Sequence, residues 1–252
     1  MTDRSPAEVV ARRVDTLRAL TEAVDTKAEL ARSVGVSRST ADRSLRELAT
    51  LGFVVSTADG YRLTTPGRLA LDEHDRRTDR IGAFADAAPL FDGVDLSFDL
   101  DPAVFDGARV VEARPHAPHR PSECVAALVA DAAHVSVYST RHLSGNATPY
   151  HDRVLDGMTG TFVVTDRVVE QQEMTRPDDL QEALDLGRVA LRRTDRDDPV
   201  TLVLAETPDG PEMGLIVYLA DTPRGFVGTD DPAATRWARD LHDLLWREAT
   251  PV

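Results

Sequence analysis

The sequence predicts an α+β protein of two domains, a helical domain at residues 1–88 and a mixed α/β domain at residues 89–252. Three observations support this fold class. The length of 252 residues suits two modest domains. Helical periodicity dominates up to residue 88, and strand patterns alternate with helical ones beyond it. Hydrophobic residues make up 42% of the chain, which is enough for a packed core.

Charge is distributed unevenly along the chain. The 43 acidic and 29 basic side chains give a net charge of -14, of which residues 1–70 contribute +2 and the remaining 182 residues -16. A nearly neutral N-terminal segment in an otherwise acidic chain is expected for a protein whose N-terminal segment contacts phosphates. No apolar run reaches the roughly 18 residues of a membrane span. The N-terminus also lacks an apolar signal-peptide core, so we expect a cytoplasmic protein.

Lys27 is the only lysine, and aspartates far outnumber glutamates. The C-terminal part therefore has no Walker lysine and no Schiff-base lysine. This composition resembles proteins of halophilic archaea, in which acidic groups solvate the surface at high salt. A GC-rich genome, which favours arginine over lysine, is the alternative explanation.

Each element of the first domain has a local signal. Apolar spacing predicts a first helix over 8–24. Thr26 and Glu29 are expected to form a capping box at the start of a second helix over 27–34, and Gly35 is expected to end that second helix. Ser37 caps a third helix that ends near Gly52. Residues 53–55 and 61–63 form a hairpin around the turn 58–60, and a fourth helix, capped by Thr65, continues to about residue 88.

This order of elements is that of a winged helix-turn-helix. The segment TKAELARSVGVSRSTADRSLRELATLGFV closely resembles archaeal and bacterial winged-helix regulators, and the Leu63–Gly67 segment matches the start of their next helix. The resemblance covers roughly residues 8–80 and implies DNA binding.

The third helix is expected to present its N-terminal residues to base edges in the major groove. Arginine can pair bidentately with guanine, small hydroxyls can reach phosphates, and a wing arginine can touch the adjacent backbone. The predicted DNA-binding residues are Lys27, Ser37, Arg38, Ser39, Thr40, Arg43, Arg46 and Arg62. The alternative is a solvated face on which Arg43 and Arg46 pair with Asp42 and Glu47.

Strands and helices alternate in the second domain. Residues 109–112 are expected to be a strand or the end of a helix. Further strands are expected at 134–138, 161–165, 188–193, 200–205, 213–219 and 225–228. Helices are expected from a Ser122 cap, at 149–158, from 166, at 178–186 and at 232–249. Such a pattern predicts a mixed sheet covered by helices.

The second half resembles the effector domain of archaeal winged-helix regulators of the methanogenesis-regulatory type. The resemblance rests on PVTLVLAE, EMGLIVYLAD, TGTFVVTDRVVEQ and the stretch from Asp230 through Trp237 to Trp246. It implies a domain that senses a ligand or signal. The half also resembles part of a phospholipase-D-like fold, but the lysine of that His-Lys-Asp chemistry is absent.

A ligand pocket is expected where strands end, since ligands in open α/β sheets lie beyond the carboxyl ends of strands. The predicted ligand residues are Tyr138, Ser139, Arg141, His142 and Asp166. Arg141 would suit an anionic ligand, with Tyr138 as an amphipathic wall. An ordinary polar loop is the alternative.

Catalytic signatures are missing from the sequence. GxSxG, HExxH, GxGxxG and P-loop motifs do not occur. His116 and His119 lie in a proline-rich loop without helical metal-ligand spacing, and the lone Cys124 sits among apolar residues typical of a buried position. We therefore expect no enzyme, no metal and no cofactor.

The sequence thus predicts a homodimeric transcription regulator that binds double-stranded DNA and senses a small ligand or signal. Dimerisation is expected because one recognition helix reads few base pairs, and the helix over 69–88 and the C-terminal helix are the expected interfaces. The alternative is a scaffold that uses the winged helix as a protein-interaction module.

Overall fold

The computed structural model describes residues 5–21, 26–58, 60–141 and 147–251. The chain divides into two compact units, Met1–Asp79 and Arg80–Val252, and each is described by itself. The division falls within helix α4 (Thr65–Phe91), ahead of the domain boundary predicted between residues 88 and 89.

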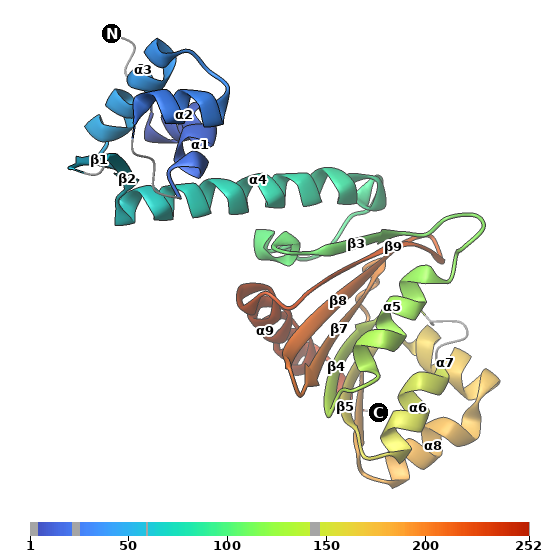
Figure 1. Ribbon diagram of the computed structural model, residues 1–252. Helices are drawn as coiled ribbons and strands as arrows, with labels where there is room; N and C mark the ends of the chain where they lie inside the picture. Colours follow the sequence, from blue (N-terminus) through green and yellow to red (C-terminus); the bar gives the residue numbers. More distant parts are fainter. Residues whose placement is uncertain (1–4, 22–25, 59, 142–146, 252) are drawn as a thin grey trace. The chain divides into compact units, whose positions relative to one another are not determined.

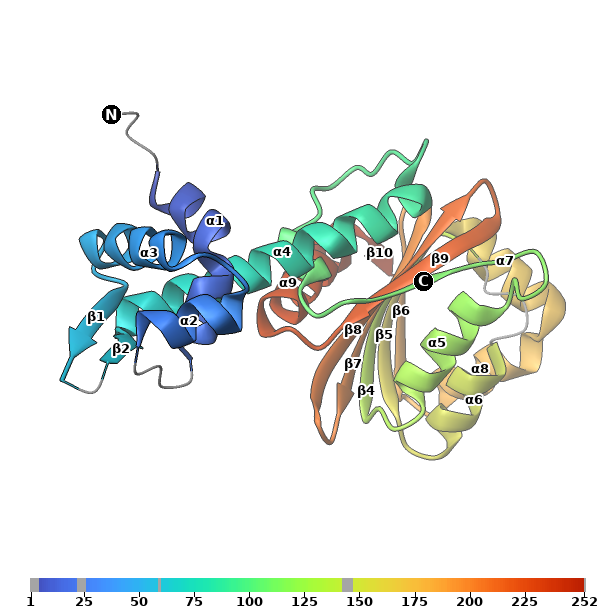
Figure 2. The same cartoon turned by 45° about the horizontal axis from the view of Figure 1, so that its top comes forward.

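The first unit is a winged helix-turn-helix (Figure 2), as predicted. It contains α1 (Pro6–Ala19), α2 (Lys27–Val34), α3 (Arg38–Thr50), the hairpin strands β1 (Val54–Thr57) and β2 (Gly60–Leu63), and the first part of α4. The side chains of Thr26 and Ser37 cap α2 and α3, and Gly35 between these helices has φ +74°. Leu17, Leu30 and Leu48 are fully buried at the centre of this unit.

Two boundaries of this unit differ from expectation. α1 ends at Ala19, and the rest of the helix predicted to reach residue 24 falls partly outside the described residues. The prediction that Thr65 caps α4 is wrong, because Thr65 is the first residue of the helix. The Thr64 hydroxyl accepts the Gly67 amide hydrogen at 3.1 Å and donates to the Gly52 carbonyl at 2.6 Å, so Thr64 also ties α4 to the end of α3.

The second unit contains an eight-stranded mixed sheet in the order β10-β6-β5-β4-β7-β8-β9-β3. β4 pairs with β5, and β5 with β6, in parallel, whereas the other neighbours are antiparallel. The strands are β3 (Arg109–Glu112), β4 (His134–Ser139), β5 (Thr159–Val164), β6 (Val189–Arg193), β7 (Val200–Thr207), β8 (Gly210–Leu219), β9 (Thr222–Thr229) and β10 (Thr250–Pro251).

Helices cover both faces of this sheet (Figure 1). On one face lie α5 (Arg120–Val129), α6 (Ala147–Leu155), α7 (Asp166–Thr175) and α8 (Pro177–Asp185), and on the other lies α9 (Pro232–Glu248). The 3-10 helix η1 (Pro102–Phe105) joins the core on the α9 side. The expected Ser122 cap is wrong, because α5 already begins at Arg120 and Ser122 lies in its first turn.

Two hydrophobic cores follow from the alternation of side chains along each strand. Tyr138 and Leu202 belong to the core on the α9 side, whereas Val137 and Val203 belong to the core on the α5 side. The central strands β4 and β7 are therefore apolar on both faces.

Asp198, directly before β7, is a buried carboxylate held by several donors. It accepts hydrogen bonds from the Ser97 amide, from the Ser97 hydroxyl at 2.9 Å and from the Tyr138 hydroxyl at 2.8 Å, and its own carbonyl accepts from the Thr140 hydroxyl. These bonds compensate the desolvation of the carboxylate and fix the carboxyl end of β4 beside the start of β7.

Within the described ranges, none of the helices is both long and apolar enough to span a membrane.

Gly67 is required by a close backbone approach, so Gly67→Ala is expected to destabilise the first unit by about 2 kcal/mol. A Cβ at this position would lie 2.0 Å from the Phe53 carbonyl oxygen. The matched control is Gly82→Ala in the same helix, where a Cβ has no neighbour within 4 Å. That substitution should stabilise by up to about 1 kcal/mol through helix propensity. Denaturant unfolding monitored by circular dichroism measures both, and equal effects would contradict the packing argument.

Candidate functional site

The N-terminus of α3 presents a cluster of hydroxyl groups. The Ser37 hydroxyl oxygen lies 2.9 Å from the hydroxyl oxygens of both Ser39 and Thr40, and it accepts the Thr40 amide hydrogen at 3.2 Å. Ser37 and Ser39 are exposed, and Thr40 is half-buried. The remaining backbone amides of this first turn and the positive end of the helix dipole favour an anionic partner.

Two of the predicted DNA-binding cations are compensated by an acidic neighbour. Asp42 on α3 forms ion pairs with both Lys27 and Arg46. Hydrogen bonds from Lys27 and, next, from Arg46 lower the pKa of the Asp42 carboxyl, and the bond to Asp42 raises the pKa of Lys27. The structure thus contains the Arg46–Asp42 pair that the alternative interpretation of this helix invoked.

The other three predicted cations have no such compensation. Arg38 and Arg43 on α3 and Arg62 on β2 are exposed and form no ion pair with any residue in the described parts of the chain. Glu47, the other acidic residue of α3, instead pairs with Arg12 and Arg13 of α1, at 3.2 and 3.0 Å. Arg62 lies opposite Val55 in the hairpin register. Arg32 on α2 and Arg68 and Arg77 on α4 are likewise exposed and form no ion pair among the described residues, so the uncompensated charge of this unit includes α3 and the wing but is not confined to them.

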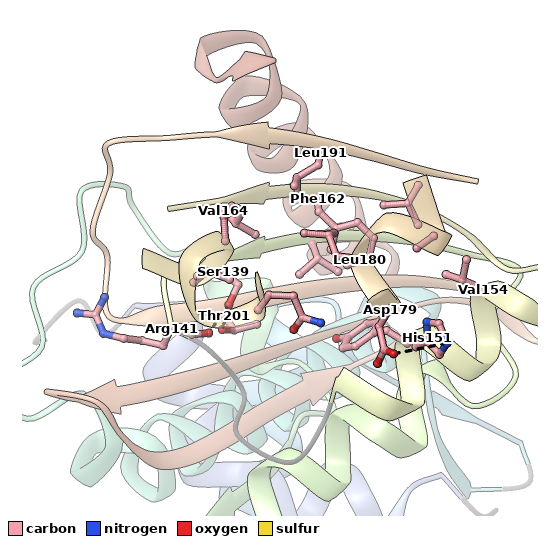
Figure 3. Close-up of a pocket in the computed structure, with 17 residues that line it drawn as sticks. Ser139, Arg141, His151, Val154, Phe162, Val164, Asp179, Leu180, Leu191 and Thr201 are labelled. Carbon is pink, nitrogen blue, oxygen red and sulfur yellow. Dashed lines mark hydrogen bonds and ion pairs between the residues drawn. The ribbon is translucent and has the colours of Figure 1, made fainter. Parts of the chain in front are cut away.

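The second unit contains a cavity of about 170 Å³ between the sheet and the helices α6, α7 and α8 (Figure 3). Its walls are mainly apolar. They comprise Val137, Tyr150, Val154, Phe162, Val164, Val168, Val169, Leu180, Ala183, Val189 and Leu191, with the polar residues Ser139, Arg141, His151, Gln172, Asp179 and Thr201. A largely apolar cavity with a few polar groups is typical of a small-molecule site.

The predicted ligand residues fall in different places. Ser139 and Arg141 line this cavity, as the strand-end argument predicts. Asp166, at the start of α7, instead lines a separate polar hollow and lies 3.4 Å from Arg193. His142 lies outside the described residues.

The prediction that Tyr138 forms a wall of the pocket is wrong. Its neighbours Val137 and Ser139 face the cavity, so Tyr138 points to the opposite face of the sheet, where it is fully buried. Burial and, next, the hydrogen bond to Asp198 raise the pKa of the Tyr138 phenol, which stays a hydrogen-bond donor. The role of Tyr138 is therefore structural.

Arg141 does not offer a free charge to an anion. Its side chain is 11% exposed and pairs with Asp197 and, at 3.1 Å, with Asp221. It also donates to the backbone carbonyls of Thr140 and Ala220, at 3.0 and 3.3 Å. Asp221 also pairs with Arg167 at 2.6 Å, so two guanidinium groups match two carboxylates and leave no excess positive charge for the anionic ligand expected from the sequence.

Most residues of the cavity come from elements that the sequence argument did not consider. Tyr150, His151 and Val154 are on α6, Leu180 is on α8, and Thr201 is on β7. A signal for Thr201 exists in the sequence: it is a polar residue within the apolar run VTLVLAE. The α6 and α8 residues depend on tertiary packing.

The chain thus combines a winged helix-turn-helix unit with an α/β unit that contains a largely apolar cavity. Residues 118–248, more than half of the chain, match the family model described as the methanogenesis regulatory protein FilR1, middle domain. The chain belongs to this family, which confirms the resemblance drawn from its motifs. Residues 6–85 match a second model, the HVO_A0261 N-terminal domain. No curated protein matches the chain.

Solved structures with similar folds are distant. TrmBL2, an archaeal chromatin protein, is 15% identical over 98% of both chains, with a TM-score of 0.46. NucT from Helicobacter pylori is 8% identical over 57% of this chain and 98% of its own, with a TM-score of 0.42. An O-methyltransferase family protein from Burkholderia thailandensis is 18% identical over 75% of this chain and 60% of its own, with a TM-score of 0.28. Because these TM-scores lie below 0.5, no property of the three proteins is transferred to this chain.

Tyr138→Phe is expected to destabilise the second unit by about 1–3 kcal/mol, because the buried Asp198 carboxylate loses a donor. In an Asp198→Asn background the same substitution should cost less, since the acceptor is uncharged. A double-mutant cycle by urea unfolding measures this coupling. Equal losses in both backgrounds would refute the role assigned to Tyr138.

Proposed function

We propose that this family member is a transcription regulator that binds double-stranded DNA through its winged helix-turn-helix. The observation that supports this proposal most is that Arg38 and Arg43 on α3 and Arg62 on the wing are exposed without a counter-ion among the described residues. The chain as a whole has a net charge of -14. An acidic protein is repelled by phosphates, so an exposed basic surface is needed for contact with a duplex.

The geometry suggests that different residues of the first unit contact different parts of the duplex. The α3 N-terminus, with the Ser37 and Ser39 hydroxyls, suits a phosphate at the edge of the major groove. Arg43, one turn further along the exposed face of α3, suits a guanine edge. Arg62 on the hairpin suits the adjacent backbone or minor groove.

The second unit, on this proposal, senses a small molecule and has no catalytic role. The cavity beside Ser139 and Thr201 supports sensing because its walls are mainly apolar. The described residues contain no group of three or more His, Cys, Asp or Glu side chains placed to hold a metal.

We also propose that the protein is a homodimer that uses α4. Ile81, Phe84, Ala85 and Ala88 are all exposed and follow the i, i+3, i+4, i+7 spacing of one helix face. Ile81 is 52% exposed and Phe84 39%. An apolar stripe of this kind suits a second copy of the same helix, and a two-fold dimer would read two half-sites.

Arg43→Ala is expected to weaken binding to the operator duplex by about 1–3 kcal/mol if Arg43 contacts a base. Arg46→Ala should cost less, because Asp42 already compensates Arg46. Fluorescence anisotropy with labelled duplexes measures both. Arg236→Ala, an exposed arginine on α9, is the control with the same change of net charge.

A salt titration with random duplex DNA then separates the regulator from the scaffold alternative. Direct phosphate contacts predict a steep fall of affinity with salt. No duplex binding at any salt concentration at which the protein is folded would favour the scaffold, and equal losses for Arg43→Ala and Arg236→Ala would remove α3 from the interface.

Ile81→Glu is expected to convert a dimer into a monomer, because it places a charge at the more exposed of the two large apolar residues in the stripe on α4. Light scattering coupled to size exclusion measures the mass. Leu219→Glu, at an exposed apolar residue of β8 that is 47% exposed, should leave the dimer intact. A monomeric wild-type protein, or a dimeric Ile81→Glu variant, contradicts this interface.

A further inference from the structure

The size and walls of the cavity limit what it can hold. A volume of about 170 Å³ is close to that of apolar protein cavities that bind benzene, so it suits a molecule of about six to ten non-hydrogen atoms. Tyr150 and Phe162 form a T-shaped pair with ring centroids 5.9 Å apart, and both line the cavity. Such an aromatic wall packs well against another ring.

Two charged side chains that line the cavity, Arg141 and Asp179, already have partners of opposite charge, and the partner of Asp179 is Arg176 at 3.3 Å. Arg141 lies at one end in Figure 3, paired with Asp197 and Asp221. His151 lies at the other end, where its Nε2 is 4.0 Å from Asp179 and 3.5 Å from Glu182. A charged ligand would lose its hydration here without gaining an unpaired counter-ion.

Hydroxyl groups form a directed chain along the sheet side of the cavity. The Ser139 hydroxyl donates to the Arg141 carbonyl at 2.8 Å. The contact of 2.7 Å between Ser139 and Thr201 is then a donation by Thr201, and the contact of 3.2 Å between Thr201 and Tyr218 is a donation by Tyr218. The Ser139 and Thr201 oxygens each keep one lone pair; Thr201 is fully buried, whereas Ser139 is 6% exposed and can accept a hydrogen bond from a ligand.

The helix side of the cavity supplies a donor instead. The buried Tyr150 hydroxyl and the buried Nδ1 of His151 have no hydrogen-bond partner among the residues that the structure describes. Burial and, next, the neighbouring Tyr218 raise the pKa of Tyr150, which keeps this phenol protonated at neutral pH. Buried polar groups without a partner are uncommon and suit a site completed by a ligand.

We infer that the cavity binds an uncharged molecule the size of a single ring that carries a hydroxyl group. A hydroxyl suits this lining, because a hydroxyl can accept from a donor such as Tyr150 and can donate to an acceptor such as Ser139. The inference deepens the sensing role proposed above and rests on it.

Four probes of similar size test this ligand class on the full chain: 4-methylphenol, toluene, benzoate and benzylamine. Isothermal titration calorimetry should show that 4-methylphenol binds and that toluene binds about two- to tenfold more weakly, as expected for one hydrogen bond. Both ions should bind at least tenfold more weakly than 4-methylphenol. Binding of either ion as tight as that of 4-methylphenol, or binding of none of the four probes, overturns the inference.

Two substitutions locate the binding. Tyr150→Phe removes only the hydroxyl, so the preference for 4-methylphenol over toluene should fall towards one; an unchanged preference overturns the role of Tyr150. Ala183→Leu fills the cavity and should weaken 4-methylphenol binding at least tenfold. Ala190→Leu, on the exposed opposite face of β6, is the matched control and should bind like the wild type. Circular dichroism confirms folding, and Tyr150→Phe remains decisive if Ala183→Leu does not fold.

Duplex binding measured on the same samples separates the two proposals. If 4-methylphenol binds and no duplex does, the regulator proposal fails and the ligand class stands. If the duplex binds and none of the probes does, the ligand class alone is overturned.

Discussion

The hydrogen bonds to the Asp198 carboxylate determine where the cavity can form. The Tyr138 hydroxyl donates to this carboxylate and the Thr140 hydroxyl donates to the Asp198 backbone carbonyl, which fixes the end of β4 beside the first residues of β7. This register places Ser139 opposite Thr201, so the two hydroxyls meet on the cavity face. A buried carboxylate without these donors would carry a large desolvation cost, and the loop after residue 95 supplies two of them through Ser97. The chemistry of one sheet face thus depends on hydrogen bonds made on the other.

In both units, aspartates compensate the charge of neighbouring basic side chains. Near the α3 surface, Asp42 neutralises Lys27 and Arg46, whereas Arg38, Arg43 and Arg62 are exposed without a counter-ion among the described residues. At the cavity, two aspartates pair with Arg141. A chain with 43 acidic side chains can place a carboxylate next to most of its cations. Under that constraint, an arginine without a counter-ion is more informative about function than the arginine content of a segment.

The local elements could be predicted well from the sequence, because their signals are local. Thr26, Gly35 and Ser37 fix the boundaries of α2 and α3 through a cap, a left-handed turn and a second cap. The sequence favours Thr65 as the cap of α4, because proline, here Pro66, is common in the first turn of a helix. The choice between Thr64 and Thr65 instead depends on the Gly52 carbonyl, which is brought close only by the fold. Cavity residues on α6 and α8 could not be predicted for the same reason, since no local pattern records which helix packs on which strand.

Tyr138 shows that a position near the end of a strand does not by itself predict that a side chain faces the ligand cavity. Proximity to the end of β4 correctly placed Ser139 and Arg141 at the cavity, but proximity alone does not distinguish the two faces of a strand. The alternation of side chains does, provided that one residue is anchored. In an amphipathic strand the apolar face provides that anchor, but Val135, Val137 and Tyr138 are buried on both faces of β4. The face of a central strand is therefore set by its partners across the sheet, here Thr201 and Leu202, and not by its own composition.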